Sequence, residues 1–151
     1  MVEALENIHF HEMFHIEGGN FTGAGAISSR VKKILREAGF PGNIVRRTSI
    51  AAFEAEMNVI CYANQGNLSL FITPDFLRVV VKDEGIGIPD VNLAMREGYS
   101  TASEKIRELG FGAGMGLSNI KKNTDEMTLT SESGQGTHLE FVIYLDNQNK
   151  E

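Results

Sequence analysis

Two short connections constrain the fold of this chain more than any other feature. Segments 68–73 and 76–83 have the composition of strands and are joined by a Thr-Pro-Asp turn, while segments 125–132 and 137–145 flank the glycine turn 133–136. Connections of this length join the antiparallel strands of hairpins. Two hairpins in one chain argue against a doubly wound parallel sheet and favour a mixed, mostly antiparallel one.

The remaining periodic segments add one strand and three helices. Residues 7–17 alternate between apolar and polar positions, which is typical of a half-buried strand. The expected helices cover 24–38, 43–64 and 116–124, and the second of them is expected to end in a turn at 64–67. The order β-α-α-β-β-loop-α-β-β predicts a two-layer α/β (α+β) sandwich with the helices on one face of the sheet. We interpret the long glycine-rich loop over 84–116 as a functional lid, with a short helix near 90–97.

Length, charge and cysteine content restrict the class of protein. With 151 residues the chain fits one domain, 1–151, and we expect 1–6 and 146–151 to be frayed. A net charge of −6 argues against nucleic acid or an anionic membrane as the main partner. The single cysteine, Cys61, excludes an internal disulfide, and the N-terminus lacks the basic flank of a signal peptide. We therefore expect a cytoplasmic protein.

The glycines cluster at three sites, and each is a candidate phosphate-binding loop. The first, Gly23 to Ser28, precedes a helix. Ser28 stands where a dinucleotide-binding fingerprint needs Gly or Ala, and no acid follows at the required spacing. The second, Asp83 to Asp90, follows a buried strand, and the third, Gly110 to Leu117, opens a helix. Alternate glycines let a backbone approach phosphates, and a helix start offers free N–H groups. Taken alone, each site is also explained as a plain turn.

Two polar side chains on the second expected helix add chemistry to this pattern. Glu54 and Asn58 are four residues apart, so they share one face of a helix whose flanking residues are apolar. A carboxylate can orient or deprotonate an attacking hydroxyl, and an amide oxygen can bind Mg²⁺. The carboxylate of Asp83, at a strand end beside a glycine turn, can accept a hydrogen bond from an exocyclic amine.

Taken in order, these motifs resemble those of the Bergerat-fold (GHKL) ATPases, which include Hsp90, DNA gyrase, histidine kinases and MutL. The order is Glu-x-x-x-Asn, Asp-x-Gly-x-Gly, Gly-x-Gly-x-Gly-Met-Gly-Leu and Gly-x-Gly-Thr. Within this superfamily the chain looks most like the small bacterial anti-sigma factor serine/threonine kinases and the stressosome switch kinase. Tyr62-Ala63 and the string Glu97-Gly98-Tyr99-Ser100-Thr101 are similar to the switch-kinase type.

The resemblance implies an ATP site with a catalytic carboxylate and a metal ligand. Glu54 would be the general base, Asn58 would bind Mg²⁺, and Asp83 would bind the adenine amine, with Thr137 nearby. The implied nucleotide-binding positions are Asn58, Asp83, Gly85, Gly87, Gly110, Gly112, Gly114, Met115, Gly116, Leu117 and Thr137. The implied cofactors are ATP and Mg²⁺.

The resemblance also implies phosphoryl transfer to a serine or threonine of a regulatory partner. That partner would be a STAS-domain antagonist, and the resemblance leaves room for a homodimer. Two alternatives stay open: an ATP- or ADP-dependent binding module that sequesters a sigma factor or other regulator, and a stand-alone histidine-kinase catalytic domain acting in trans. A docking face for an acidic partner is suggested by the basic residues Arg30, Lys32, Lys33, Arg36, Arg46 and Arg47, although a solvated helix face explains them as well.

The segment His11-Glu12-Met13-Phe14-His15 spells H-E-x-x-H, the signature of zinc proteases. That motif binds zinc only on a helix, where both histidines reach one metal. The alternating pattern instead predicts a strand, in which His11 and His15 lie about 13 Å apart. We therefore expect a surface histidine patch here.

Overall fold

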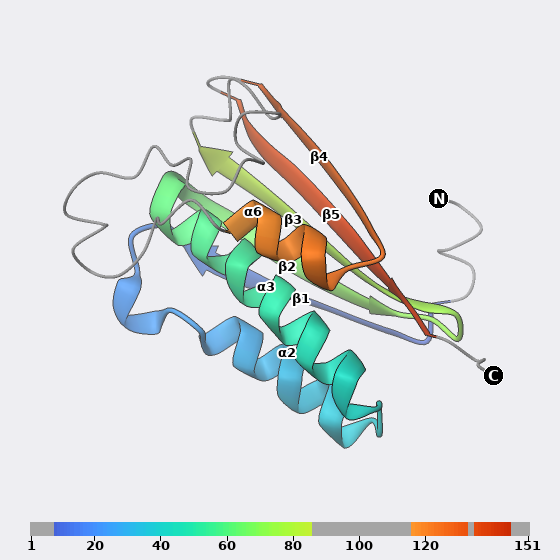
Figure 1. Ribbon diagram of the computed structural model, residues 1–151. Coiled ribbons are helices and arrows are strands. Elements are labelled where there is room, and N and C mark those ends of the chain that lie inside the picture. Colours follow the sequence, from blue (N-terminus) through green and yellow to red (C-terminus); the bar gives the residue numbers. More distant parts are fainter. Residues whose placement is uncertain (1–7, 86–115, 133–134, 146–151) are drawn as a thin grey trace.

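The computed structural model describes residues 8–85, 116–132 and 135–145, and its elements follow the order expected from the sequence (Figure 1). Their bounds are β1 Phe10–Glu17, the 3₁₀ helix η1 Phe21–Gly23, α2 Ala26–Glu37, α3 Gly42–Tyr62, β2 Ala63–Ile72, β3 Phe76–Gly85, α6 Gly116–Asn123, β4 Glu126–Glu132 and β5 Gly136–Tyr144. Most of the expected lid, including its short helix near 90–97, lies outside the described residues.

All five strands form one sheet in the order β1-β2-β3-β5-β4, and all paired neighbours run antiparallel. Both predicted hairpins are present, as the pairs β2–β3 and β4–β5. Helices α2, α3 and α6 cover one face of the sheet (Figure 1). The predicted two-layer α/β sandwich is therefore confirmed, and its sheet is antiparallel throughout the described strands rather than mixed.

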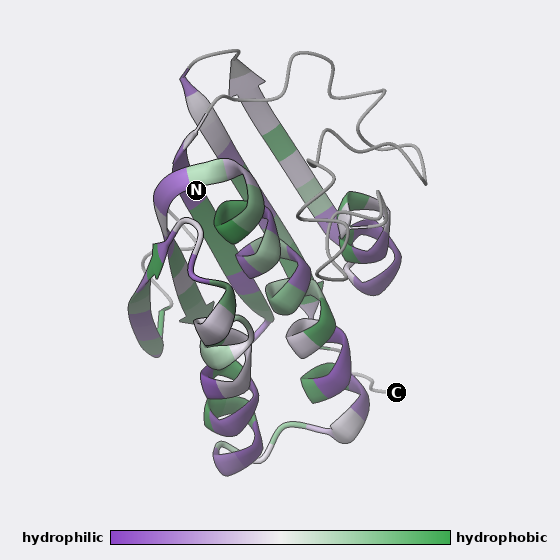
Figure 2. Cartoon of the chain, turned by 90° about the vertical axis from the view of Figure 1, so that its left-hand side faces the viewer, coloured by the Kyte–Doolittle hydropathy of each residue, from purple (hydrophilic) through white to green (hydrophobic). Residues whose placement is uncertain are grey.

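The core lies between the sheet and the helices and follows the alternation of the strands. In β1, Phe14 and Ile16 are buried, whereas His11, Met13 and His15 are exposed. In Figure 2 the strands beneath the helices carry many hydrophobic positions. The central strands contribute Leu68, Leu70, Leu77, Val79, Val81, Leu139, Phe141 and Ile143 to the hydrophobic core. One face of the sheet thus supplies the apolar surface on which the helices pack.

Helix α3 is the central helix of this layer and lies between α2 and α6 (Figure 1). Ala51, Ala52 and Ala55 are fully buried, and their small side chains let the neighbouring elements approach closely. Despite this apolar character, no helix in the described part of the chain is both long and apolar enough to cross a membrane.

The start of β2 differs from the sequence-based expectation. Residue types predict a turn at 64–67, but β2 begins at Ala63, directly after α3. Gln65, Gly66 and Asn67 pair with β1 on one side and with β3 on the other. Strand partners on both sides satisfy the backbone groups of this segment, which outweighs its local preference for a turn.

A buried carboxylate joins α3 to the N-terminus of α2. Glu56 is 1% exposed, and it accepts hydrogen bonds from the backbone N–H groups of Gly25, Ile27 and Ser28 at 3.1, 3.3 and 3.1 Å. These groups lie at the start of α2, where the helix dipole favours negative charge. The first glycine site of the sequence therefore binds an anion, but that anion is a side chain of the same protein.

We predict that Glu56→Ala lowers the free energy of unfolding by about 3 kcal/mol or more, because three N–H groups lose their buried acceptor. Glu56→Gln should cost less, since one amide oxygen remains to accept hydrogen bonds. Urea unfolding measures both effects. The control is Glu37→Ala at the exposed end of α2, which should change stability by less than about 0.5 kcal/mol. A loss no larger than that of the control would contradict a structural role for the Glu56 carboxylate.

Candidate functional site

The predicted site on α3 is formed by the side of that helix that faces α6. Glu54 and Asn58 are one turn apart, and both are partly exposed. Their oxygens converge on the first residue of α6: a Cβ placed on Gly116 would lie 3.3 Å from Glu54 Oε1 and 3.4 Å from Asn58 Oδ1. The structure thus brings three predicted site residues together. Glycine at position 116 keeps a side chain out of the space beside these two oxygens.

Helix α6 is held against α3 by polar contacts along its length. Asn119 donates a hydrogen bond from Nδ2 to Glu54 Oε2 at 3.2 Å. Farther along α6, Arg47 of α3 donates from Nε to the backbone carbonyl of Asn123 at 3.1 Å and forms an ion pair with Asp125 at 3.1 Å. Residue numbers rise along α3 as they fall along α6, so the two helices run antiparallel with a defined register.

Asp83 lies near the end of β3, on the face of the sheet that carries the helices. It continues the buried positions Leu77, Val79 and Val81 of that strand. Its Oδ1 accepts a hydrogen bond from the backbone N–H of Thr137 at 3.1 Å, and the two residues are directly paired across β3 and β5. The structure therefore also brings together the two residues that the resemblance associates with adenine.

Glycines on both neighbouring strands allow a close approach of the backbone to Asp83. On β2, a Cβ at Gly66 would lie 2.8 Å from the carbonyl oxygen of Lys82 and 3.1 Å from Asp83 Cβ. On β5, Gly136 has a φ of 94°, and a Cβ there would approach the carbonyl oxygen of Asp83 to 2.2 Å. A larger residue at either position would force the backbone to move. Glycine at these two positions therefore lets β2 and β5 pack closely against the part of β3 that carries Asp83.

The two groups of residues lie at the same end of the interface between α3 and the sheet. A Cβ at Gly66 would lie 3.1 Å from Asp83 Cβ and also 3.1 Å from Cγ1 of Val59. Val59 directly follows Asn58 on α3. The strand position beside Asp83 is therefore in contact with the helical turn that carries the amide oxygen of Asn58.

The remaining predicted positions are either packed or not described. Leu117 is buried in the hydrophobic core, so its side chain serves packing. Gly85 lies against the end of α3, where a Cβ would be 2.9 Å from the carbonyl oxygen of Tyr62. Outside the described residues lie Gly87, Gly110, Gly112, Gly114 and Met115.

Two residues of this region were missed by reasoning from the sequence. Asn119 follows Gly116 by three positions, so their spacing already places them close together on one turn of the helix that the glycine motif opens. Gly66 gave no such signal, because its neighbours have the composition of a turn. Only its pairing with Asp83 across β2 and β3 reveals its place beside the site.

The zinc-protease interpretation is wrong, because the histidines of its motif lie on strand β1. His11 stacks on Phe71 with their ring centroids 4.3 Å apart, and His15 contacts a carboxylate oxygen of Glu17 at 2.6 Å. In the part of the chain that the structure describes, no three His, Cys, Asp or Glu side chains are arranged to hold a metal ion.

Cys61 is also unsuited to nucleophilic chemistry. The thiol is half-buried near the end of α3, and burial raises its pKa to about 11. Because the thiolate is the reactive form, a thiol with so high a pKa is inert at neutral pH. The residue therefore packs against the core, as its apolar helix face predicts.

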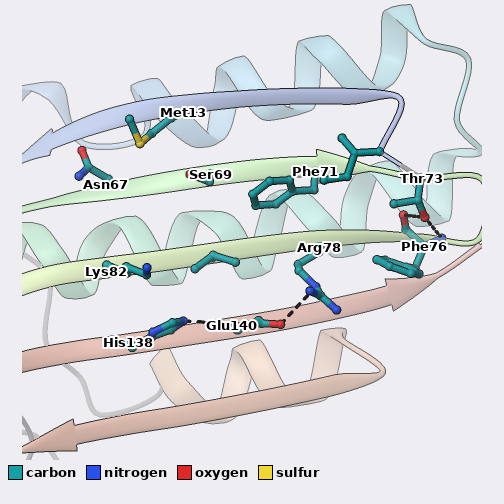
Figure 3. A pocket seen from close by; sticks show the side chains of 12 residues that line it. Met13, Asn67, Ser69, Phe71, Thr73, Phe76, Arg78, Lys82, His138 and Glu140 are labelled. Atoms are coloured by element: carbon teal, nitrogen blue, oxygen red, sulfur yellow. Dashed lines mark hydrogen bonds and ion pairs between the residues drawn. The ribbon is translucent and has the colours of Figure 1, made fainter. Parts of the chain in front are cut away.

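A separate hollow of about 420 Å³ lies on the sheet face that points away from the helices (Figure 3). Its lining combines Met13, Phe71 and Phe76 with an ion pair between Arg78 and Glu140 at 3.2 Å. None of the described residues that the motifs assign to the site lines this hollow. The hollow and the predicted site are therefore on opposite faces of the sheet.

Burial raises the pKa of Asp83, and the hydrogen bond from Thr137 opposes this by lowering it. A raised pKa means that the folded state binds the proton more tightly than the unfolded state, so the carboxylate costs stability once pH rises through its folded pKa. We predict that Asp83→Asn becomes more stable relative to the unmodified chain as pH rises from about 3 to 7. Urea unfolding across this range measures the difference. Asp75→Asn makes the same change at an exposed turn and serves as the control. The prediction would be contradicted if the stability of Asp83→Asn relative to the unmodified chain fell with rising pH.

Comparison of the sequence with known proteins shows which family the chain resembles. The model of the family described as histidine kinase-, DNA gyrase B-, and HSP90-like ATPase matches residues 43–149. The chain is 30% identical over 118 residues to the serine/threonine-protein kinase RsbT of Bacillus subtilis (strain 168), which covers 76% of this chain and 83% of that protein. It is 32% identical over 100 residues to the anti-sigma F factor of Caldanaerobacter subterraneus subsp. tengcongensis, which covers 63% of this chain and 66% of that protein.

Among solved structures, the Mycobacterial sensor histidine kinase MprB is similar to this chain with a TM-score of 0.53 and 17% sequence identity, covering 88% of this chain and 97% of that one. A likeness at this identity supports the fold alone. The family match spans most of the chain and includes both groups of residues, Glu54 with Asn58 and Asp83 with Thr137. The chain therefore belongs to the family of histidine kinase-, DNA gyrase B- and HSP90-like ATPases, which implies that it binds ATP.

Proposed function

We propose that this chain binds ATP with Mg²⁺ between α3 and α6 and transfers the γ-phosphoryl group to a serine or threonine of a regulatory protein. The observation that supports this most is the convergence of Glu54 Oε1 and Asn58 Oδ1 on Gly116. The carboxylate of Glu54 can accept a proton and the amide oxygen of Asn58 can bind a cation, and both lie beside the start of α6. The N–H groups at a helix start favour phosphate.

The residues at this position fit Mg²⁺, which prefers oxygen ligands. We assign the metal to Asn58, whose amide oxygen lies beside the start of α6. Mg²⁺ usually takes one or two ligands from the protein and the others from substrate phosphates and water. When bound, the metal neutralises charge that develops on the transferred phosphoryl group.

We assign Glu54 as the general base of the transfer. The hydroxyl oxygen of the partner attacks the γ-phosphorus, and the bond from this phosphorus to the β,γ-bridging oxygen breaks. The hydroxyl proton passes to Glu54, and ADP leaves with the electron pair of the broken bond. A base must lie within hydrogen-bond reach of the proton that it takes, and Oε1 is the oxygen of Glu54 that lies beside Gly116.

We assign Asp83 to the adenine of ATP. Its carboxylate can accept a hydrogen bond from the exocyclic amine, while Oδ1 also holds the backbone of Thr137. Gly66 and Gly136 let the neighbouring strands pack closely against the backbone that carries this carboxylate, because a side chain at either position would collide with β3. A carboxylate acceptor at this position favours adenine over bases that present an oxygen in place of the amine.

A STAS-domain antagonist is the partner that we propose, because the motifs of the chain resemble those of the stressosome switch kinase. The similarity to the serine/threonine-protein kinase RsbT supports a protein as the acceptor. The basic residues of α2 and α3 offer a face for an acidic protein surface. Arg30 and Arg47 form ion pairs with acids of the same chain, whereas Lys33, Arg36 and Arg46 are exposed. An excess of exposed basic groups in a chain of net charge −6 would speed association with an acidic partner.

A second function is supported by the similarity to an anti-sigma F factor. In that case the chain binds a sigma factor or another regulator when ATP or ADP is bound, and turnover is slow. The same α3–α6 site serves both functions. They differ in whether the partner leaves with a phosphoryl group.

Incubation with γ-labelled ATP, Mg²⁺ and candidate STAS-domain proteins tests the proposal. We expect acid-stable label on a serine or threonine of one candidate, and none after that residue is changed to alanine. Acid-labile label would indicate transfer to histidine, and nucleotide-dependent binding without label would indicate the second function. Independently, ATP with Mg²⁺ at 100 times Kd should stabilise the fold by about 2.7 kcal/mol, and the absence of any shift would overturn the nucleotide site.

We predict that Glu54→Ala retains ATP binding but lowers kcat by at least about 100-fold, because a general base acts in the transition state rather than in the bound ground state. Label transfer gives kcat, and the nucleotide-induced shift in melting temperature reports binding. Glu37→Ala, at an exposed position of α2, serves as a control and should leave both unchanged. Loss of ATP binding in Glu54→Ala would contradict the assigned role.

We predict that Gly116→Ala weakens ATP binding by about tenfold or more, or 1.4 kcal/mol, because the added Cβ displaces Glu54 Oε1 and Asn58 Oδ1. Gly42→Ala is the matched control, since a Cβ at the start of α3 meets nothing within 4 Å. Isothermal titration calorimetry with ATP measures the affinity of both variants. Equal affinities for the two variants would show that the space beside Gly116 is not used by the nucleotide.

A further inference from the structure

Asn119 lies beside the carboxylate that the proposed function uses as a base, and no motif of the sequence assigns a role to it. The residue is on α6, one turn after Gly116, and it is partly buried. Its Nδ2 donates to Glu54 Oε2 at 3.2 Å. Because an ionised carboxylate only accepts hydrogen bonds, the amide nitrogen is the end of Asn119 that must face it.

This contact distinguishes the two oxygens of Glu54. Oε2 is held by Asn119, whereas Oε1 lies next to Gly116, on the side where Asn58 Oδ1 also lies. Rotation about the last bond of a glutamate side chain is soft, so an untethered carboxylate samples a broad range of orientations. A hydrogen bond to one oxygen restricts this rotation and fixes where the other oxygen points.

The donor itself is held in place by the rest of α6. At the far end of this helix, Arg47 binds the carbonyl of Asn123 and pairs with Asp125. The side chain of Asn123 donates to the carbonyl of Asn119 at 2.8 Å. Leu117 and Ile120 bury the same helix against the core. The amide of Asn119 is therefore presented from a rigid element rather than from a mobile side chain on a loop.

We propose that Asn119 is a positioning residue that orients the carboxylate of Glu54, so that Oε1 faces the start of α6. The inference rests on the proposed role of Glu54 as general base. Asn119 itself does not need to touch the nucleotide or the acceptor hydroxyl. A displacement of a catalytic group by about 1 Å can cost about 100-fold in rate, so the effect falls on kcat.

Asn119→Leu tests this inference, because it keeps the approximate size and shape of the side chain and removes the N–H donor. We expect kcat for phosphoryl transfer to fall by at least about tenfold, with the KM for ATP and the nucleotide-induced melting shift unchanged. Asn43→Leu is the matched control: it makes the same change at an exposed position at the start of α3, eleven residues before Glu54, and should retain the rate. If Asn119→Leu does not fold, Asn119→Ala replaces it in the same comparison.

A double-mutant cycle shows whether Asn119 acts through Glu54. In a Glu54→Ala background, Asn119→Leu should lower the rate no further, because the group that it positions is already absent. An additional loss in that background, or an unchanged rate in the single Asn119→Leu variant, would overturn the inference. The side-chain amide resonances of Asn119 provide a readout without turnover, and they should shift in Glu54→Ala; unshifted resonances would mean that the hydrogen bond does not exist in solution.

The same measurements separate this inference from the proposed function. A Glu54→Ala variant with full activity would refute the base assignment and the positioning role together. Loss of activity in Glu54→Ala with full activity in Asn119→Leu would refute the positioning role alone.

Discussion

Helix α3 packs between α2 and α6 on one face of the sheet, and this packing sets the surroundings of every site residue on α3. Three fully buried alanines let the neighbouring elements approach this helix closely. Because α3 is enclosed on several sides, a polar side chain on one of its enclosed faces must find a partner in a particular neighbour. Glu56 therefore faces α2, while Glu54 and Asn58 face α6.

Two helix starts in this protein meet carboxylates, and they serve different purposes. At the start of α2, Glu56 is buried and uses the N–H groups of Gly25, Ile27 and Ser28, so this end is closed by the chain itself. At the start of α6, Glu54 is only partly buried, and one of its oxygens is held by a side-chain amide. The second arrangement leaves backbone N–H groups near a carboxylate and an amide oxygen, which is the combination that a phosphate with a bound cation can use.

Much of the fold could be predicted from local pattern. The turn between the β2 and β3 segments and the glycine turn before β5 required hairpins, and the alternation in β1 placed Phe14 and Ile16 in the core. The start of β2 could not be predicted, because the residues at 64–67 have turn composition and become a strand only through pairing on both sides. Glu56 escaped notice for a similar reason: the N–H groups that it binds lie 28 to 31 residues away in the sequence.

The order of the elements, the family and the spacing of Glu54 and Asn58 can be predicted from the sequence, because helical and strand periods and short motifs are local properties of the chain. The groups that meet these residues depend on how the helices and strands pack. The antiparallel register of α3 and α6 places Gly116 beside both oxygens and Asn119 beside Glu54, and the pairing of β2 with β3 places Gly66 beside Asp83. Such contacts join residues that are far apart in the sequence, and they depend on packing that no local pattern encodes.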